Sequence, residues 1–137
     1  MARRTLTDSE KAARTARMEL LATAAQLIDT GDAPRVELAA AILSGYSRRN
    51  ICLILAQCDE RGREFPQAVA GFHDWRKAGR IVRKGAKGYA IYAPMIRKDK
   101  DTGEEQRKGY SIRYVFDVAD TEPITADSPA TLTELIG

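Results

Sequence analysis

Residues 71–88 read GFHDWRKAGRIVRKGAKG, and this stretch combines a short helical pattern, several glycines and a high density of positive charge. Phe72, Trp75 and the following Tyr89 are aromatic, and the cations in the stretch or just after it are Arg76, Lys77, Arg80, Arg83, Lys84, Lys87 and Arg97. Positive charges neutralise phosphates and rings stack on exposed bases, so the pattern is typical of surfaces that bind single-stranded nucleic acid. The alternative is a solvated basic hairpin attached to an amphipathic helix, with Trp75 in the core.

The positive charge is concentrated in the middle of the chain. The net charge is +3 overall, and it is +1 over residues 1–70, +7 over residues 71–116 and −5 over residues 117–137. A basic middle followed by an acidic end indicates an anionic partner at one surface. It argues against a protein whose whole surface imitates DNA.

Three motifs in and around this stretch resemble one protein family. They are Phe72, then Gly79, then V-R-K-G-x-K-G over residues 82–88; Y-S-R-R-N over residues 46–50, ahead of an apolar helix; and YVFDVADTE over residues 114–122. Their order is similar to that in the N-terminal domain of the ArdC-type antirestriction proteins. The V-R-K-G-x-K-G element is the specific part of this resemblance.

The resemblance covers roughly residues 36–124. It implies a small α+β domain that binds single-stranded DNA with little sequence preference. The roles that it implies are antirestriction, protection of plasmid, phage or other mobile-element DNA, and accessory replication or repair. In the larger relatives this domain precedes a zinc metallopeptidase-like domain, which we do not expect in this chain.

Capping signals and apolar periodicity predict four helices. Thr7 and Glu10 form a capping box for the first helix, and Gly79 ends the last. The expected ranges are about 8–29, 36–43, 48–61 and 73–78. We expect the first helix to pack through the face formed by Ala13, Ala16, Leu20, Ala24, Leu27 and Ile28.

The remaining pattern predicts strands at 81–83, 89–95 and 110–118, with a hairpin loop at 98–105. They would form a small, mainly antiparallel sheet of about three or more strands, packed on the N-terminal helices in an α+β fold. Residues 110–118 alternate, and we expect one face to be the core, formed by Tyr110, Ile112, Tyr114, Phe116 and Val118.

A length of 137 residues fits one domain with a real core. We expect a flexible basic arm at 1–6, the single-stranded-DNA-binding domain at 7–122 and an acidic tail at 123–137. The tail has three interpretations: a solvated end, a stub leading to another domain, or an acidic, apolar-tipped peptide. Such a peptide would compete with DNA for the basic groove or dock a partner protein.

No secretory or membrane-spanning pattern is visible, so we expect a cytoplasmic protein without a membrane partner. Cys52 and Cys58 are six residues apart in a predicted helix, a spacing that does not suit a disulfide. We therefore expect buried free thiols. Asp74, Asp117 and Asp120 could in principle hold Mg²⁺, but no fixed spacing supports this. We expect no catalytic residues, no metal and no cofactor.

Residues 48–50 open a predicted helix, whose N-terminus would offer a phosphate seat. Asn50 could instead make a structural hydrogen bond, Phe72 more often packs inward at this position, and Trp75 fits a core anchor as well as a stacking platform. Arg113 is a phosphate ligand if its face lines the groove. The predicted DNA-binding residues are Arg48, Arg49, Asn50, Phe72, Trp75, Arg76, Lys77, Arg80, Arg83, Lys84, Lys87, Tyr89 and Arg113.

A second hypothesis is a protein-interaction module, such as an inhibitor of a host-defence enzyme. It would use the basic surface and the acidic tail. The sequence leaves open whether RNA or duplex DNA also binds, and what the oligomeric state is.

Overall fold

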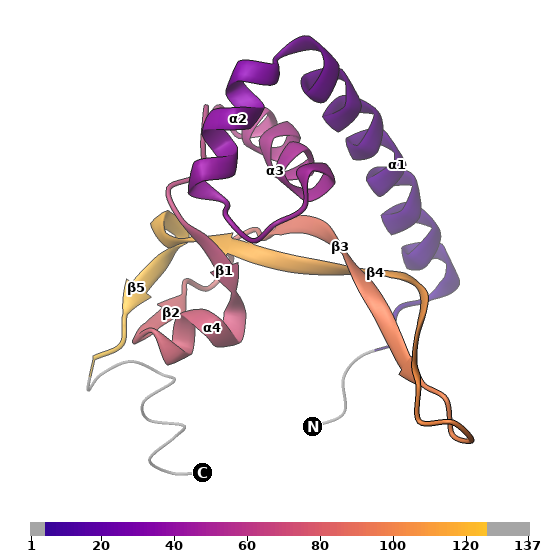
Figure 1. Ribbon diagram of the computed structural model, residues 1–137. Helices are drawn as coiled ribbons and strands as arrows, with labels where there is room; N and C mark the ends of the chain where they lie inside the picture. The colour runs from indigo at the N-terminus through magenta and orange to yellow at the C-terminus, as the bar shows by residue number, and fades with distance from the viewer. Residues whose placement is uncertain (1–4, 126–137) are drawn as a thin grey trace. The chain divides into compact units, whose positions relative to one another are not determined.

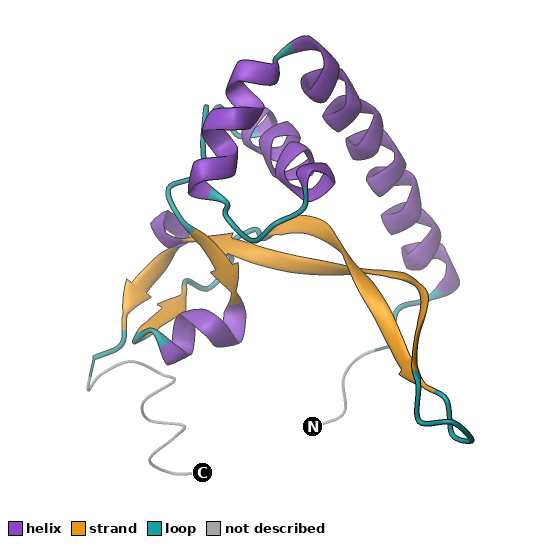
Figure 2. Cartoon of the chain, in the orientation of Figure 1, coloured by secondary structure: helices purple, strands orange, loops and turns teal. Residues whose placement is uncertain are grey.

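The structure is a computed structural model in which residues 5–125 are described. The chain divides into two compact units, unit 1 (Met1–Phe65) and unit 2 (Pro66–Gly137), which follow one another in the colour ramp of Figure 1. Unit 1 is helical, whereas unit 2 contains the strands drawn in orange in Figure 2. Helices followed by antiparallel strands confirm the predicted α+β fold.

Unit 1 consists of three helices with polar caps, namely α1 (Asp8–Gly31), α2 (Ala33–Ile42) and α3 (Arg48–Glu60). The predicted capping box is confirmed, because the Glu10 backbone N–H donates to Thr7 Oγ1 (3.1 Å) and the Thr7 N–H donates to Glu10 Oε1 (3.2 Å). The Asp32 side chain caps α2 by accepting from the Arg35 N–H, and the Ser47 side chain caps α3 by accepting from the Asn50 N–H. Each cap satisfies a backbone donor that the start of a helix leaves unpaired.

The core of unit 1 is built on α3. Every residue from 51 to 58 in this helix is buried, and the polar Gln57 among them donates its amide N–H to the Leu53 carbonyl (3.0 Å). A helix that is buried all round has to be surrounded by other chain segments. The other two helices of the unit supply buried side chains, from α1 Met18, Leu21 and Ala25, and from α2 Val36 and Ala39.

The predicted packing face of α1 is wrong. The buried residues are Met18, Leu21 and Ala25, whereas Leu20 is 74% exposed and Leu27 is 68% exposed. An alanine-rich helix carries apolar residues on more than one face. Spacing alone therefore did not identify the face that is covered.

Unit 2 is organised around a long antiparallel hairpin, and its elements are β1 (Val69–Gly71), α4 (Phe72–Lys77), β2 (Arg80–Val82), β3 (Tyr89–Lys98), β4 (Glu105–Asp117), η1 (Val118–Asp120) and β5 (Thr121–Pro123). The main sheet has the order β1-β4-β3, and β2 pairs with β5 in a separate two-stranded sheet. The predicted hairpin is confirmed. The predicted third strand is wrong, because 80–82 pairs with 121–123 and the three-residue β1 takes its place beside β4.

The buried face of β4 is also the opposite of the one predicted. Tyr89 pairs with Val115 on one face of the sheet, and both are buried together with Asp117. On the other face, Tyr114 is 46% exposed and Tyr110 is 52% exposed. Aromatic residues favour burial in general, but strand alternation shows only which residues share a face and leaves open which face is covered.

Asp117 can be buried because backbone donors surround its carboxylate. Backbone N–H groups of Gln67 (3.1 Å), Ala68 (3.4 Å) and Ala119 (3.3 Å) donate to it. A buried charge is tolerated only with such hydrogen bonds. These bonds connect the residues that lead into β1 with the end of β4 and the start of η1.

Within residues 5–125, no helix is long and apolar enough to cross a membrane. Cys52 and Cys58 are both free and buried, which confirms the prediction for the thiols. Burial raises the pKa of the Cys52 thiol above its ordinary value, because the thiolate would lose solvation.

We expect both thiols to resist iodoacetamide at pH 8 in the folded protein, because they are inaccessible and the reactive thiolate is scarce at Cys52. Mass spectrometry would follow the modification with time, and the same reaction in guanidinium chloride is the control, in which both thiols should react. Modification of either thiol within minutes in the folded protein would contradict this expectation.

Candidate nucleic-acid interface

Three of the exposed predicted cations lie on and just after a turn that follows β2. The Ala86 N–H donates to the Arg83 carbonyl (3.1 Å), and Gly85 has a φ of 82° at the third position. This is the geometry of a type II turn, in which that position requires a positive φ and is usually glycine. We call Arg83, Lys84 and Lys87, whose side chains are all exposed, the basic turn.

Two arginines near the turn have structural partners. Arg80 donates from Nε to Thr121 Oγ1 (2.6 Å) and from Nη2 to the Thr121 carbonyl (3.2 Å), which ties β2 to β5. Arg83 lies 3.9 Å from Glu122 Oε2 and donates weakly to the Ala119 carbonyl (3.5 Å). Arg80 therefore has a structural role in joining β2 to β5, whereas the side chain of Lys84 is exposed to solvent.

The predicted aromatic residues have three different environments. Trp75 is partly buried and its Nε1–H donates to the Phe116 carbonyl (2.8 Å), so its indole anchors α4 to β4. Phe72 is 40% exposed and meets His73 edge to face at 5.5 Å, so the inward packing expected for it is wrong. Tyr89 is fully buried and its ring cannot stack on a base.

One face of the hairpin carries three tyrosines, Tyr92, Tyr110 and Tyr114, which we call the tyrosine strip; Tyr110 and Tyr114 are exposed, and Tyr92 is partly buried. Tyr114 pairs with Ala90 and Tyr92 pairs with Ile112, which places the three side chains on one face of β3 and β4. The rings of Tyr92 and Tyr110 are 6.3 Å apart at 72°, an edge-to-face contact. Sequence reasoning assigned Tyr110 and Tyr114 to the core, whereas both are exposed.

Gly88 joins the basic turn to the tyrosine strip. A Cβ atom at Gly88 would lie 2.9 Å from Tyr114 Cβ and 3.2 Å from the Phe116 ring, so only glycine lets the backbone pass here. Lys87 is the preceding residue, so the basic turn is connected in the chain to the backbone that packs against Tyr114. The spacing of Gly85 and Gly88 in the sequence was the visible signal for this arrangement.

The other predicted DNA-binding cations of unit 2, Arg76, Lys77 and Arg113, lie on α4 and β4. Arg113 pairs with Ile91 on the face of β4 opposite the tyrosine strip, although its side chain is exposed. Arg76 and Lys77 occupy the last turn of α4, where positive charge interacts favourably with the helix dipole. The structure therefore does not place Arg113 with the rings.

Three of the thirteen predicted residues, Arg48, Arg49 and Asn50, belong to unit 1, in the first turn of α3. Arg48 Nε is 2.5 Å from Asp29 Oδ1 in α1, and this hydrogen bond raises the pKa of Arg48. The Asn50 backbone N–H donates to Ser47 Oγ (3.2 Å). At the predicted phosphate-binding site, the Asn50 backbone N–H and the Arg48 guanidinium therefore already have partners within the protein.

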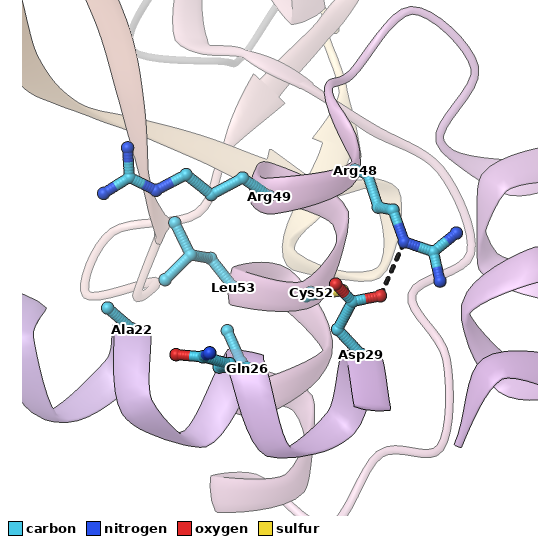
Figure 3. Close-up of a pocket in the computed structure, with 8 residues that line it drawn as sticks. Ala22, Gln26, Asp29, Arg48, Arg49, Cys52 and Leu53 are labelled. Atoms are coloured by element: carbon cyan, nitrogen blue, oxygen red, sulfur yellow. Dashed lines mark hydrogen bonds and ion pairs between the residues drawn. The ribbon is translucent and has the colours of Figure 1, made fainter. Parts of the chain in front are cut away.

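Arg48 and Arg49, but not Asn50, border a cleft of about 370 Å³ between α1 and α3 (Figure 3), which is lined by Ala22, Ala25, Gln26, Asp29, Arg48, Arg49, Cys52 and Leu53. Figure 3 shows the Arg48–Asp29 pair on one side of Cys52 and the Arg49 side chain extending away from it. The buried Ala25, Cys52 and Leu53 form an apolar lining. Among the described residues, no group of three or more His, Cys, Asp or Glu side chains is placed to hold a metal ion.

Residues 21–118 match the family model described as the N-terminal domain of anti-restriction factor ArdC. Because this match spans more than half of the chain, the protein belongs to that family, which confirms the resemblance seen in the sequence. No protein of curated function matches the chain.

A solved structure, the metal-free crystal structure of the antirestriction ArdC protein from the R388 plasmid, is similar at 24% identity with a TM-score of 0.41. The similarity covers 56% of this chain and 29% of that chain, so this chain matches less than a third of that protein's length. The family assignment rests on the family model and not on this similarity.

We expect Gly88→Ala to lower the free energy of unfolding by about 1–3 kcal/mol, because the new methyl group overlaps the Tyr114 side chain. Urea unfolding followed by circular dichroism would measure the change. The matched control is Gly31→Ala, at a glycine that has nothing within 4 Å of the added Cβ, and little change is expected there. Equal stability of Gly88→Ala and wild type would show that the close contact with Tyr114 is absent.

Proposed function

We propose that this protein binds single-stranded DNA with little sequence preference and without catalysis, in the protection or processing of plasmid or phage DNA. Antirestriction, named in the description of its family, is the role that we assign to this binding. The observation that carries the proposal is the basic turn, which has exposed cations and is connected in the chain to the tyrosine strip through Gly88. The buried free thiols are compatible with the cytoplasm as the place of action.

The basic turn suits contact with a phosphodiester backbone. Lys84 is exposed at the second position of the turn, next to Gly85, which has no side chain to hold a ligand away. Lysine acts on phosphate as a point charge, and contacts with phosphate carry no sequence information. Low sequence preference follows from this mode of contact.

A protein partner is the second candidate. The acidic tail that would supply its specificity lies almost wholly outside residues 5–125. The exposed leucines of α1 are the observation in its favour, because large exposed apolar side chains mark some protein interfaces. Capture of the same host protein before and after nuclease treatment would support this candidate.

We expect Lys84→Gln to weaken the binding of a labelled oligonucleotide of mixed sequence. The slope of log K against log salt should fall by about 0.7 for each lysine removed, because one fewer counterion is released. Fluorescence anisotropy with single-stranded DNA, duplex DNA and RNA at several salt concentrations would measure both quantities. Lys87→Gln should behave in the same way.

The matched control is Lys11→Gln, which removes the same charge from an exposed position of α1. Its affinity and salt slope should equal those of wild type. An equal loss in Lys11→Gln and Lys84→Gln would show that net charge acts and not the basic turn. Failure of wild type to bind any of the three nucleic acids at low salt would overturn the proposal.

A further inference from the structure

We propose that the tyrosine strip is a base-stacking site for consecutive unpaired nucleotides, with the basic turn holding the phosphates at the Tyr114 end. This inference rests on the proposed function, and it adds the residues that read the unpaired state of the strand. In this proposal the tyrosine strip takes the stacking role that the sequence suggested for Tyr89. Trp75 is a structural anchor and does not stack on a base.

The first argument is the exposure of the rings. Tyr110 and Tyr114 are about half exposed, although their strand also has a buried face that includes Val115 and Asp117. The register places these two tyrosines, with Tyr92, in a row along one face of the hairpin. Aromatic rings in a row on a sheet are a surface on which bases can stack, whatever their sequence.

The second argument is that two of the rings are ordered before any ligand binds. Tyr92 and Tyr110 contact each other edge to face. A tyrosine ring has few rotatable bonds, and a ring that is already ordered loses little entropy on binding. The Tyr92–Tyr110 pair is therefore prepared for stacking with little rearrangement.

The third argument is the spacing along the strand. Residues on one face of a strand repeat at about 7 Å, and the four-residue separation of Tyr110 and Tyr114 corresponds to about 14 Å. Phosphates along one strand of duplex DNA advance by about 3.4 Å per nucleotide, with the base faces covered by their neighbours. Stacking on the strip therefore needs a strand that is extended and unpaired, which selects single-stranded over duplex DNA.

The fourth argument is the position of charge. Lys87 immediately precedes Gly88, whose backbone packs against Tyr114, so the basic turn leads into the strip at its Tyr114 end. Toward the hairpin loop, Lys98 pairs with Glu105 and Arg97 pairs with the uncharged Gln106. Residues 83–88 contain no acidic residue, so phosphate contacts are expected first at the Tyr114 end, and stacking continues from there toward Tyr110.

The test compares Tyr110→Leu, Tyr114→Leu and the corresponding phenylalanine variants in the full chain. Leucine keeps an apolar side chain and removes the ring, whereas phenylalanine keeps the ring. The probes are single-stranded and blunt duplex oligonucleotides of the same mixed sequence, with anisotropy for affinity. A single-stranded probe containing 2-aminopurine reports stacking by its fluorescence.

Each leucine variant should bind single-stranded DNA roughly 5- to 150-fold more weakly, the range expected for one stacked base. The salt slope should stay at the wild-type value, because no phosphate contact is lost. The phenylalanine variants should restore the affinity and the 2-aminopurine signal. Duplex affinity should change less than single-strand affinity in every variant.

The matched control is Ile96→Ala, an exposed apolar position of β3 beyond the register shift that follows Pro94, and it should bind as wild type. Circular dichroism checks that each variant is folded. If Tyr114→Leu does not fold, the more exposed Tyr110→Leu decides.

Two results would overturn the inference while leaving the proposed function intact. One is wild-type affinity for single-stranded DNA in both leucine variants while the lysine variants still weaken binding. The other is an equal loss of single-stranded and duplex binding in the leucine variants. Absence of binding by wild type would instead overturn the proposed function itself.

Discussion

The buried carboxylate of Asp117 fixes the geometry on which unit 2 depends. It accepts hydrogen bonds from backbone N–H groups of the segment before β1 and of the start of η1. These bonds hold two segments that are distant in sequence together at the end of β4. The register of β1 on β4 follows from this point. A slip by one residue would exchange the two faces of β4. The same bonds that bury Asp117 and Val115 therefore keep Tyr114 outside.

Local signals in the sequence were sufficient for the helices and the hairpin. Thr7 with Glu10, and Ser47, predicted helix starts, because capping depends only on residues a few positions apart. Gly79, with a φ of 83°, ended α4 as predicted. The basic turn was also recognisable, since its charges and glycines are neighbours in the chain.

Long-range choices were not predictable in the same way. Which face of α1 or β4 is covered depends on segments that pack from elsewhere, and both elements have apolar residues on two faces. The pairing of β2 with β5 joins two three-residue strands, which are too short to show a period. The wrong face for β4 is also why Tyr110 and Tyr114 were assigned to the core, whereas Tyr89 was chosen for its place after the basic stretch and is buried. A single error about the covered face of β4 thus affected the description of both the fold and its exposed surface.

The two glycines of the basic turn differ in what they can tolerate during sequence change. Gly85 has a positive φ and open space around it, so asparagine, which adopts that conformation more readily than other residues, is an acceptable replacement. Gly88 has no room for any side chain, whatever its conformation. Selection that maintains the surface therefore acts differently at two positions three residues apart. If the Gly88–Tyr114 contact is maintained by selection, homologous sequences should vary at Gly85 and keep glycine at Gly88.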